Sequence, residues 1–161
     1  MQERPANTAA IQRAPRGTYP ARLDAGGRLK MPAKYVEHLQ NIEDKSLYAT
    51  IFNGLPRIFT NGSWERNLAR LDNDPALKKR IAFYCDSVGG DVELDKQDRL
   101  TLPPRLREEA KLGEQTLRLR FYQDIITLYP ESVYESECAE VRSTMEADQQ
   151  RASSMGMGID L

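Results

Sequence analysis

Two blocks of the sequence place an acid and an arginine at one fixed spacing. The first begins at Leu23 with "LDAGGRLKMP" and the second at Leu94 with "LDKQDRLTLP", and both fit L-D-x-x-x-R-L-x-x-P. In each block the acid, Asp24 or Asp95, can accept hydrogen bonds from the arginine and from N–H groups of a tight turn. The rest of the guanidinium then offers a planar set of donors to phosphate or guanine. The blocks therefore predict anion binding, and a purely structural turn clamp is the alternative for both acids.

The candidate anion-binding residues lie in and around the two blocks. They are Arg16, Arg22, Arg28, Lys30 and Lys34 in the first half of the chain, and Arg99 and Arg105 in the second. In the first block, Gly26 and Gly27 allow a ligand to approach the backbone closely. In the second, Asp98, Glu108 and Glu109 bring negative charge near the arginine in sequence. We therefore expect the first copy to bind anions better than the second.

Catalytic and metal-binding chemistry has little support in the sequence. His38 is the single histidine, and neither a P-loop, an H-E-x-x-H motif nor a G-x-G-x-x-G motif occurs. Cys85 and Cys138 lack the spacing of a metal-binding pair, and we expect both to be reduced thiols. The sequence thus predicts a protein that is not an enzyme and that needs no cofactor or metal.

The elements that must position the blocks repeat along with them. In each copy a strand precedes the acid, a second strand contains the arginine, and a proline, Pro32 or Pro103, opens a helix. A β-hairpin follows, with its turn at "NGL" in the first copy and at "QD" in the second, and then a further helix. A β-β-α-β-β unit of about forty residues is too small to be stable alone. We therefore expect an α+β fold in which two tandem copies close one shared barrel, flanked by helices.

The chain divides accordingly, and its charge is uneven. The predicted parts are a mobile N-terminal extension (1–14), a first repeat (16–62), a helical linker (63–88), a second repeat (89–132), and a C-terminal helix and tail (133–161). The N-terminal part is basic and the C-terminal part acidic, which suits a nucleic-acid face with an acidic tail, two ends that attract in an assembly, or plain solvation. No apolar run of about 18 residues and no hydrophobic leader occurs, so we expect no membrane partner and a cytoplasmic location.

The stretches "RGTYPARLDAGGRLKMP" and "VELDKQDRLTLPPRLREEAKL" resemble the MraZ family of bacterial transcriptional regulators. The resemblance covers roughly residues 16–150 and includes both D-x-x-x-R motifs. It implies a pseudo-dimeric swapped-hairpin β-barrel similar to AbrB and SpoVT DNA-binding domains. It also implies a homo-oligomeric closed ring, located on the nucleoid, that binds short repeats in double-stranded DNA upstream of the division and cell-wall operon.

In this resemblance the DNA-contacting role maps onto Arg28, with the neighbouring basic residues as phosphate contacts. The chain departs from the family pattern in its extension 1–14, at Gly26, where a lysine is common, and at Asp98, where a glycine is common. The alternative function is an oligomeric protein-interaction module of the antitoxin-like barrel type that does not bind DNA. The acidic C-terminal helix could pack on a neighbouring subunit or restrain the basic N-terminal segment.

Overall fold

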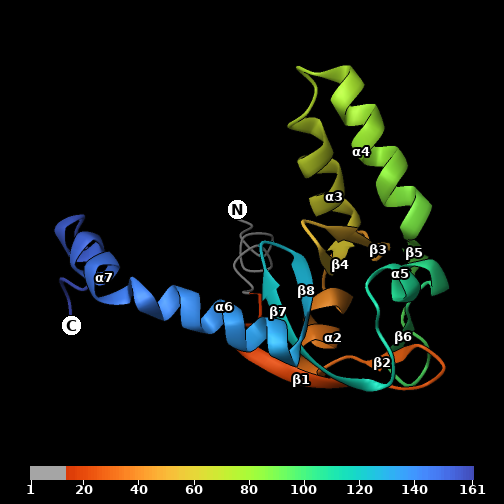
Figure 1. Ribbon diagram of the computed structural model, residues 1–161, viewed down its shortest axis with the longest axis horizontal. Coiled ribbons are helices and arrows are strands. Elements are labelled where there is room, and N and C mark those ends of the chain that lie inside the picture. The colour runs from red at the N-terminus through yellow and green to blue at the C-terminus, as the bar shows by residue number, and fades with distance from the viewer. Residues whose placement is uncertain (1–13) are drawn as a thin grey trace, which may run out of the picture.

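A computed structural model describes residues 14–161, so the predicted extension 1–14 lies outside the described residues except for Ala14 (Figure 1). The strands are β1 (Thr18–Leu23), β2 (Arg28–Lys30), β3 (Leu47–Phe52), β4 (Leu55–Thr60), β5 (Gly90–Val92), β6 (Arg99–Thr101), β7 (Gln115–Tyr122) and β8 (Ile125–Pro130). They form one antiparallel sheet in the order β5-β3-β4-β8-β7-β1-β2-β6, which curls into a nearly closed barrel.

The two halves of the chain share this sheet. Strands of one half pair with strands of the other at β3–β5, β4–β8, β1–β7 and β2–β6. The block leucines meet in the core, where Leu29 of β2 lies opposite Leu100 of β6 and both side chains are fully buried. Burial of each such leucine is worth roughly 1.5–3 kcal/mol, and half a barrel could not exclude water from it. The expected α+β fold with two tandem swapped-hairpin repeats is confirmed.

The helices are α2 (Ala33–Gln40), α3 (Asn61–Ala69), α4 (Pro75–Val88), α5 (Pro104–Glu109), α6 (Glu131–Ser143) and α7 (Met145–Ser154). Pro32 and Pro103 immediately precede α2 and α5, as expected from their fixed φ. The cap of α3 is Thr60, whose Oγ1 accepts a 3.1 Å hydrogen bond from the N–H of Ser63. The single C-terminal helix that the sequence indicates is instead two helices, divided at Thr144.

Both hairpin turns are left-handed at two successive residues, which matches the right-handed twist of the strands they join. The first has Asn53 at φ 53° and Gly54 at φ 79°. The second has Gln123 at φ 54° and Asp124 at φ 62°, without a glycine to relieve the strain. The carbonyl of Asp124 accepts hydrogen bonds from Thr60 N–H (3.2 Å) and from the Ser63 hydroxyl (2.8 Å), so the start of α3 holds this turn in place.

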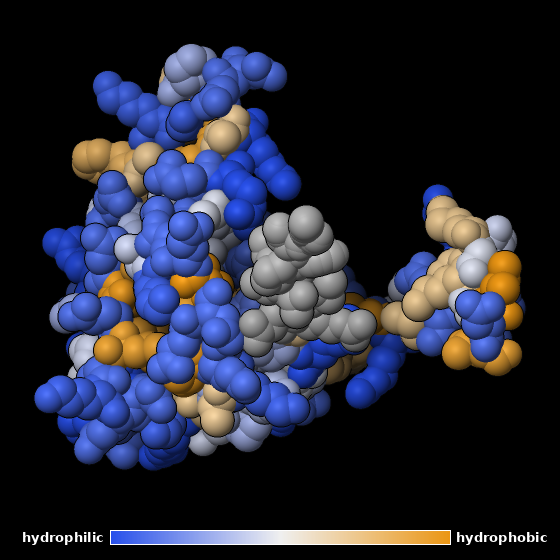
Figure 2. All heavy atoms as spheres, turned by 180° about the vertical axis from the view of Figure 1, so that it is seen from behind, coloured by the Kyte–Doolittle hydropathy of each residue, from blue (hydrophilic) through white to orange (hydrophobic). Residues whose placement is uncertain are grey.

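Two helical projections leave the barrel in different directions (Figure 1). α3 and α4 form a hairpin at one side, and α6 continued by α7 forms an arm at another. Apolar side chains gather near the tip of the arm, where Met155, Met157, Ile159 and Leu161 are exposed (Figure 2). Among residues 14–161, no helix combines the length and the apolar character needed to span a bilayer.

Candidate nucleic-acid interface

The first block folds as a turn closed by its own acid. Asp24 Oδ1 accepts hydrogen bonds from the N–H groups of Gly26 (3.0 Å) and Arg28 (2.9 Å). Asp24 Oδ2 accepts a 2.9 Å bond from Arg28 Nε. The Arg28 N–H is the main cause that holds the pKa of the Asp24 carboxyl below its usual value, because it stabilises the charged form.

The second block repeats this geometry closely. Asp95 Oδ1 accepts from the N–H groups of Gln97 (2.8 Å) and Arg99 (2.9 Å), and Asp95 Oδ2 accepts from Arg99 Nε (3.2 Å). The Arg99 N–H likewise lowers the pKa of the Asp95 carboxyl. Each acid therefore clamps the turn and orients an arginine at the same time. Within residues 14–161, the terminal guanidinium nitrogens of Arg28 and Arg99 have no hydrogen-bond partner, so both remain free for a ligand.

Pairing of β2 with β6 brings the two arginines into one patch. Lys30 lies directly opposite Arg99, and Arg28 directly opposite Thr101. Since Leu29 and Leu100 between them point inward, these four side chains share the outer face of the sheet. Like charges directly opposite one another are destabilising unless an anion or acid compensates them.

The row that crosses the sheet through Lys30 is basic. β1 and β2 pair with Leu23 opposite Leu29, so the next residues outward, Arg22 and Lys30, are also opposite one another. Arg22, Lys30 and Arg99 thus form a line of three cations across three strands, about 10 Å long at the usual strand spacing. We call this line the basic row. Arg22 has one partner, Glu114 at 3.2 Å, and both side chains are more than half exposed, which leaves the pair weak.

The adjacent row, through Arg28, carries mixed charge. Asp95 N–H bonds to the carbonyl of Arg99, but β5 and β6 are not paired, and Glu93 and Thr101 line the hollow between them. Arg28 lies opposite Thr101, and we call these two residues, together with Glu93 at the edge of the hollow, the mixed row. This hollow has a volume of about 580 Å³ and lies where the barrel is not fully closed. It is lined in part by Asp91, Glu93, Asp95, Arg99 and Thr101. The patch is therefore acidic on the side of this hollow and basic on the side of β1.

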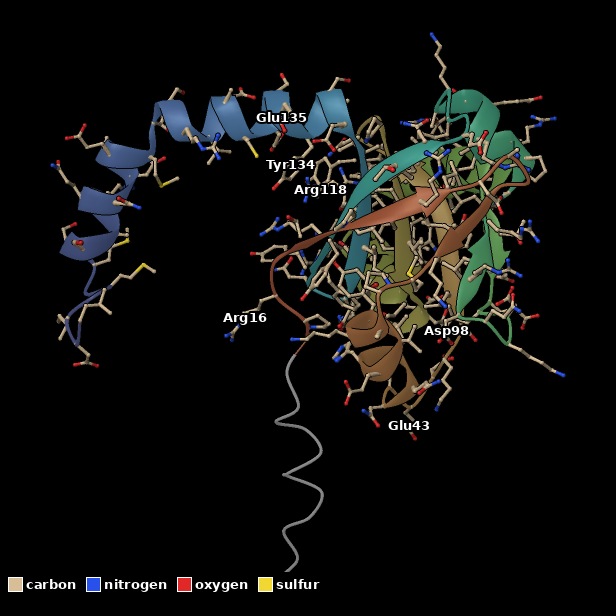
Figure 3. All side chains as sticks on the ribbon, turned by 90° about the horizontal axis from the view of Figure 1, so that it is seen from below. Arg16, Glu43, Asp98, Arg118, Tyr134 and Glu135 are labelled. Atoms are coloured by element: carbon tan, nitrogen blue, oxygen red, sulfur yellow. The ribbon has the colours of Figure 1, made fainter. Side chains whose placement is uncertain are left out.

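The other predicted anion-binding residues lie away from these rows. Arg16 and Lys34 line a separate hollow together with Tyr19 and His38. Arg16 precedes β1 and is six residues from Arg22, so the two are about 20 Å apart along an extended strand. Figure 3 shows Arg16 and Asp98 at opposite sides of the sheet. Arg105 is exposed on the first turn of α5, and nothing in residues 14–161 links it to the patch.

Sequence reasoning missed Arg107. Its guanidinium lies over Gly27, where an added Cβ would be 2.5 Å from Arg107 Cζ, and its Nε donates a 3.2 Å hydrogen bond to the carbonyl of Leu102. Gly27 also has φ +84°, whereas the second turn has Asp98 at φ 63° in the same place. A glycine inside a turn was the available signal, but the sequence could not indicate that an arginine from the other repeat covers it.

Together the two turns offer paired guanidinium forks beside a lysine on the outer, solvent-accessible face of the sheet. This arrangement suits a linear polyanion, because the positive charges follow a line instead of surrounding a pocket. Within the described part of the chain, no group of three or more His, Cys, Asp or Glu side chains is arranged to hold a metal ion.

Comparison with known proteins identifies the family. A family model described as "MraZ protein, putative antitoxin-like" matches residues 90–155. A protein of Koribacter versatilis named "Transcriptional regulator MraZ" is 33% identical over 116 residues, which are 69% of this chain and 79% of that protein. The chain belongs to the MraZ family. This confirms the resemblance that the paired D-x-x-x-R motifs indicate.

Other relatives have a slightly higher sequence identity to the chain over a shorter aligned segment. The protein named "Transcriptional regulator MraZ" in Coxiella burnetii is 35% identical over 107 residues, covering 63% of this chain and 70% of its own length. The protein of that name in Pseudomonas putida is also 35% identical over 107 residues, with 71% of its length covered. This MraZ-family chain thus aligns with 70% or more of each of these relatives, over more residues than one repeat contains.

Proposed function

We propose that the protein is a sequence-specific DNA-binding transcriptional regulator. The observation that carries the proposal is the basic row of Arg22, Lys30 and Arg99, with Arg28 beside it, built across the junction of the two repeats. The relatives' name, transcriptional regulator, supports the same conclusion. We propose no catalytic role.

The geometry suits the major groove of B-DNA. That groove is about 12 Å wide and admits a β-ribbon, and the patch is about 10 Å across. Arg28 and Arg99 each keep two terminal nitrogens in a plane fixed by the acid clamp, as a bidentate contact to guanine or phosphate requires. Arg22 and Lys30 are then phosphate contacts. Arg16, Lys34 and Arg105 stay outside the proposed contact patch, because the structure does not place them beside it.

The finer parts of the proposal rest on the family resemblance. They are a closed homo-oligomeric ring, short repeats upstream of the division and cell-wall operon as the target, and a cytoplasmic, nucleoid-associated location. Several patches held in register on one ring would bind successive repeats with an avidity that a single weak contact cannot reach.

Fluorescence anisotropy with the DNA upstream of the protein's own gene, against scrambled DNA, tests the proposal at two salt concentrations. The charges of the neighbouring residues in the sequence alone suggest that Arg28→Ala should lower DNA affinity far more than Arg99→Ala. The row geometry changes that expectation, since Arg99 lies beside Lys30 and Arg28 beside Thr101. We now expect both variants to lose about tenfold or more in affinity, and each to flatten the slope of log K against log salt by about 0.9.

Arg70→Ala is the matched control, because Arg70 is an exposed arginine that ends α3 on the helical hairpin. It should bind as the wild type does. If folded wild-type protein binds neither DNA, the regulator proposal fails and a protein partner becomes the better hypothesis. If Arg99→Ala binds normally while Arg28→Ala does not, the basic row is not the contact surface.

A further inference from the structure

α6 begins beside β7 and β8 and runs away from the barrel, and one of its faces lines a hollow (Figure 1). The hollow has a volume of about 340 Å³. Five residues at the spacing of one helical stripe line it from α6: Tyr134, Glu137, Cys138, Val141 and Arg142. No residue of α6 is buried, so this stripe does not pack closely on the sheet. The space beneath it is large enough for a small ligand.

The floor of the hollow is the outer face of the sheet. Thr18 of β1, Arg120 of β7 and Tyr129 of β8 line it from this side. Strand pairing places Arg120 between Thr18 and Thr127, which lie directly opposite it on the two neighbouring strands. The hydroxyl groups of Thr18 and Tyr134 share a hydrogen bond of 3.2 Å, which ties the start of α6 to β1. The position of the helix over the floor is therefore fixed.

An arginine of the first repeat lies beside the same floor. Arg57 of β4 is directly opposite Thr127, across β8 from Arg120, and its Nη1 donates a 3.0 Å hydrogen bond to Thr127 Oγ1. Burial is the main cause that lowers the pKa of the Arg57 guanidinium, and the nearby Tyr129 and Glu137 oppose this effect. Arg57 is thus a partly buried cation next to two residues of the lining.

Positive charge exceeds negative charge at this hollow. Arg120 and Arg142 line it and Arg57 lies beside it, whereas Glu137 is the one acid in its lining. Three positive charges against one negative charge leave an excess of about two. Within residues 14–161, none of these three arginines forms an ion pair. Cations that are partly removed from water without a partner favour the binding of an anion.

The hollow also offers apolar surface. The rings of Tyr129 and Tyr134 pack with their centroids 5.8 Å apart, and Val141 is 46% exposed although it is aliphatic. The Arg118 guanidinium lies 5.0 Å from the centre of the Tyr134 ring, and Figure 3 shows the two side chains together where α6 leaves the sheet. A ligand that fills the hollow therefore contacts both cations and aromatic or aliphatic groups.

We propose that the hollow under α6 binds a small phosphate monoester that carries an aromatic ring. The charge of a phosphate monoester at pH 7, about −1.5 to −2, matches the excess positive charge of the hollow. Arg120 and Arg142 have the planar donors that suit phosphate oxygens, and the aromatic ring would lie against Tyr129 and Val141.

This site is separate from the basic row. Thr18, in the floor of the hollow, and Arg22, in the basic row, are four residues apart on β1, which is about 13 Å along an extended strand. The inference goes beyond the proposed DNA binding and does not depend on it.

Cys138 reports on occupancy of the hollow, because it lies in the lining, whereas Cys85 is fully buried. The full-length chain is alkylated with iodoacetamide, a small neutral reagent, at constant ionic strength, and modification of each cysteine is followed by mass spectrometry. Phenyl phosphate should slow the reaction of Cys138 several-fold at saturation. Inorganic phosphate should protect Cys138 less well, and phenol at the same concentration should not protect it. The dependence on phenyl phosphate concentration gives the dissociation constant.

Substitutions at exposed positions, which the fold should tolerate, test the assigned residues. Arg120→Gln and Arg142→Gln should each weaken phenyl phosphate binding about tenfold or more, since each removes a charged hydrogen-bond donor. Glu137→Gln should strengthen binding several-fold, because it removes the acid from the lining. Arg151→Gln, at an exposed arginine of α7, makes the same change in charge outside the lining and should bind as the wild type does.

Three results would overturn the proposed site: no protection of Cys138 by phenyl phosphate, equal protection by phenol, or equal binding by the wild type, Arg120→Gln and Arg142→Gln. Duplex DNA from upstream of the protein's own gene is the second probe. If the duplex protects Cys138 and phenyl phosphate does not, the arginines contact DNA and the small-ligand proposal fails. A protein that binds phenyl phosphate as expected but binds no DNA counts only against the regulator proposal.

Discussion

The two copies of the L-D-x-x-x-R-L block have the same backbone and different surfaces. In both, the acid accepts the same three hydrogen bonds, and the leucine after the arginine is fully buried. On the outer face, Arg22 of the first copy corresponds to Glu93 of the second, and Lys30 to Thr101. The shared residues are those that the turn and the core require, and the divergent ones are exposed, where packing sets few limits.

Pairing of strands between the two copies determines where the divergent surface residues lie. If each copy kept to itself, the first would be wholly basic and the second nearly neutral. Because β2 pairs with β6, the arginine of each copy lies beside the exposed residues of the other. The second-copy arginine, Arg99, therefore lies in the basic row, and the first-copy arginine, Arg28, lies in the mixed row. One cationic patch is built from both copies, with a basic end and an acidic end.

The largest difference between the two copies is expected in the effect on stability of substitutions in their turns. Gly27→Ala should lower the free energy of unfolding by about 1–2 kcal/mol, because alanine is strained at φ +84°. The same change also displaces Arg107 from its place over the turn. Asp98→Gly, at the matching position, should leave stability unchanged or raise it by less than about 1 kcal/mol. Urea unfolding followed by circular dichroism measures both.

The neighbouring glycine provides the control for this test. Gly26 does not have a left-handed φ, and an added Cβ would meet its nearest atom at 3.5 Å, an ordinary contact distance. Gly26→Ala should therefore change stability by less than about 0.5 kcal/mol. Equal losses at Gly26 and Gly27 would contradict the geometric difference between the two residues.

Charge changes in the mixed row should have a smaller but informative effect. Glu93→Arg gives the second copy the residue that the first copy has at Arg22, and it removes an acid from the hollow that Thr101 lines. We expect DNA affinity to rise several-fold and the salt slope to steepen by about 0.9 for one new phosphate contact. Anisotropy titrations at a series of salt concentrations measure both quantities.

Glu65→Arg makes the same change in net charge at an exposed position of α3, away from the patch. It should raise the affinity far less and leave the slope unchanged. If the two variants behave alike, the gain reflects net charge alone, and the mixed row does not face the DNA.

The smallest expected effect concerns Asp24 and Asp95, the acids at the matching position of the two turns. The pKa values of the Asp24 and Asp95 carboxyls lie below the usual value because backbone N–H groups stabilise the charged forms. Their contribution to stability is therefore complete above the ordinary aspartate pKa, about 3.9, and is lost as the pH falls through the lowered folded values. Carboxyl NMR titration should give low and similar midpoints for both. A normal titration midpoint at Asp95 together with a low midpoint at Asp24 would contradict the equivalence of the two turns.

Much of the local structure could be predicted from the sequence. The strand at residues 18–23, the left-handed turn at Asn53 and the helices after Pro32 and Pro103 follow from rules that act over a few residues. Neighbouring residues with similar capping ability are harder to separate: at the start of α3, Thr60 accepts the capping hydrogen bond, and the adjacent Asn61 donates to Asp44. The break at Thr144 had no glycine or proline to announce it.

The amino-acid sequence alone determined the acid clamp, the element types and the family, because each depends on residues close together in the chain. Only the tertiary structure decided that Lys30 lies beside Arg99 and that Arg107 covers Gly27. These depend on pairing between segments about seventy residues apart, where many registers satisfy the local hydrogen-bonding rules. Burial of both sets of leucines in one barrel selects a single register, and that choice places the surface charges.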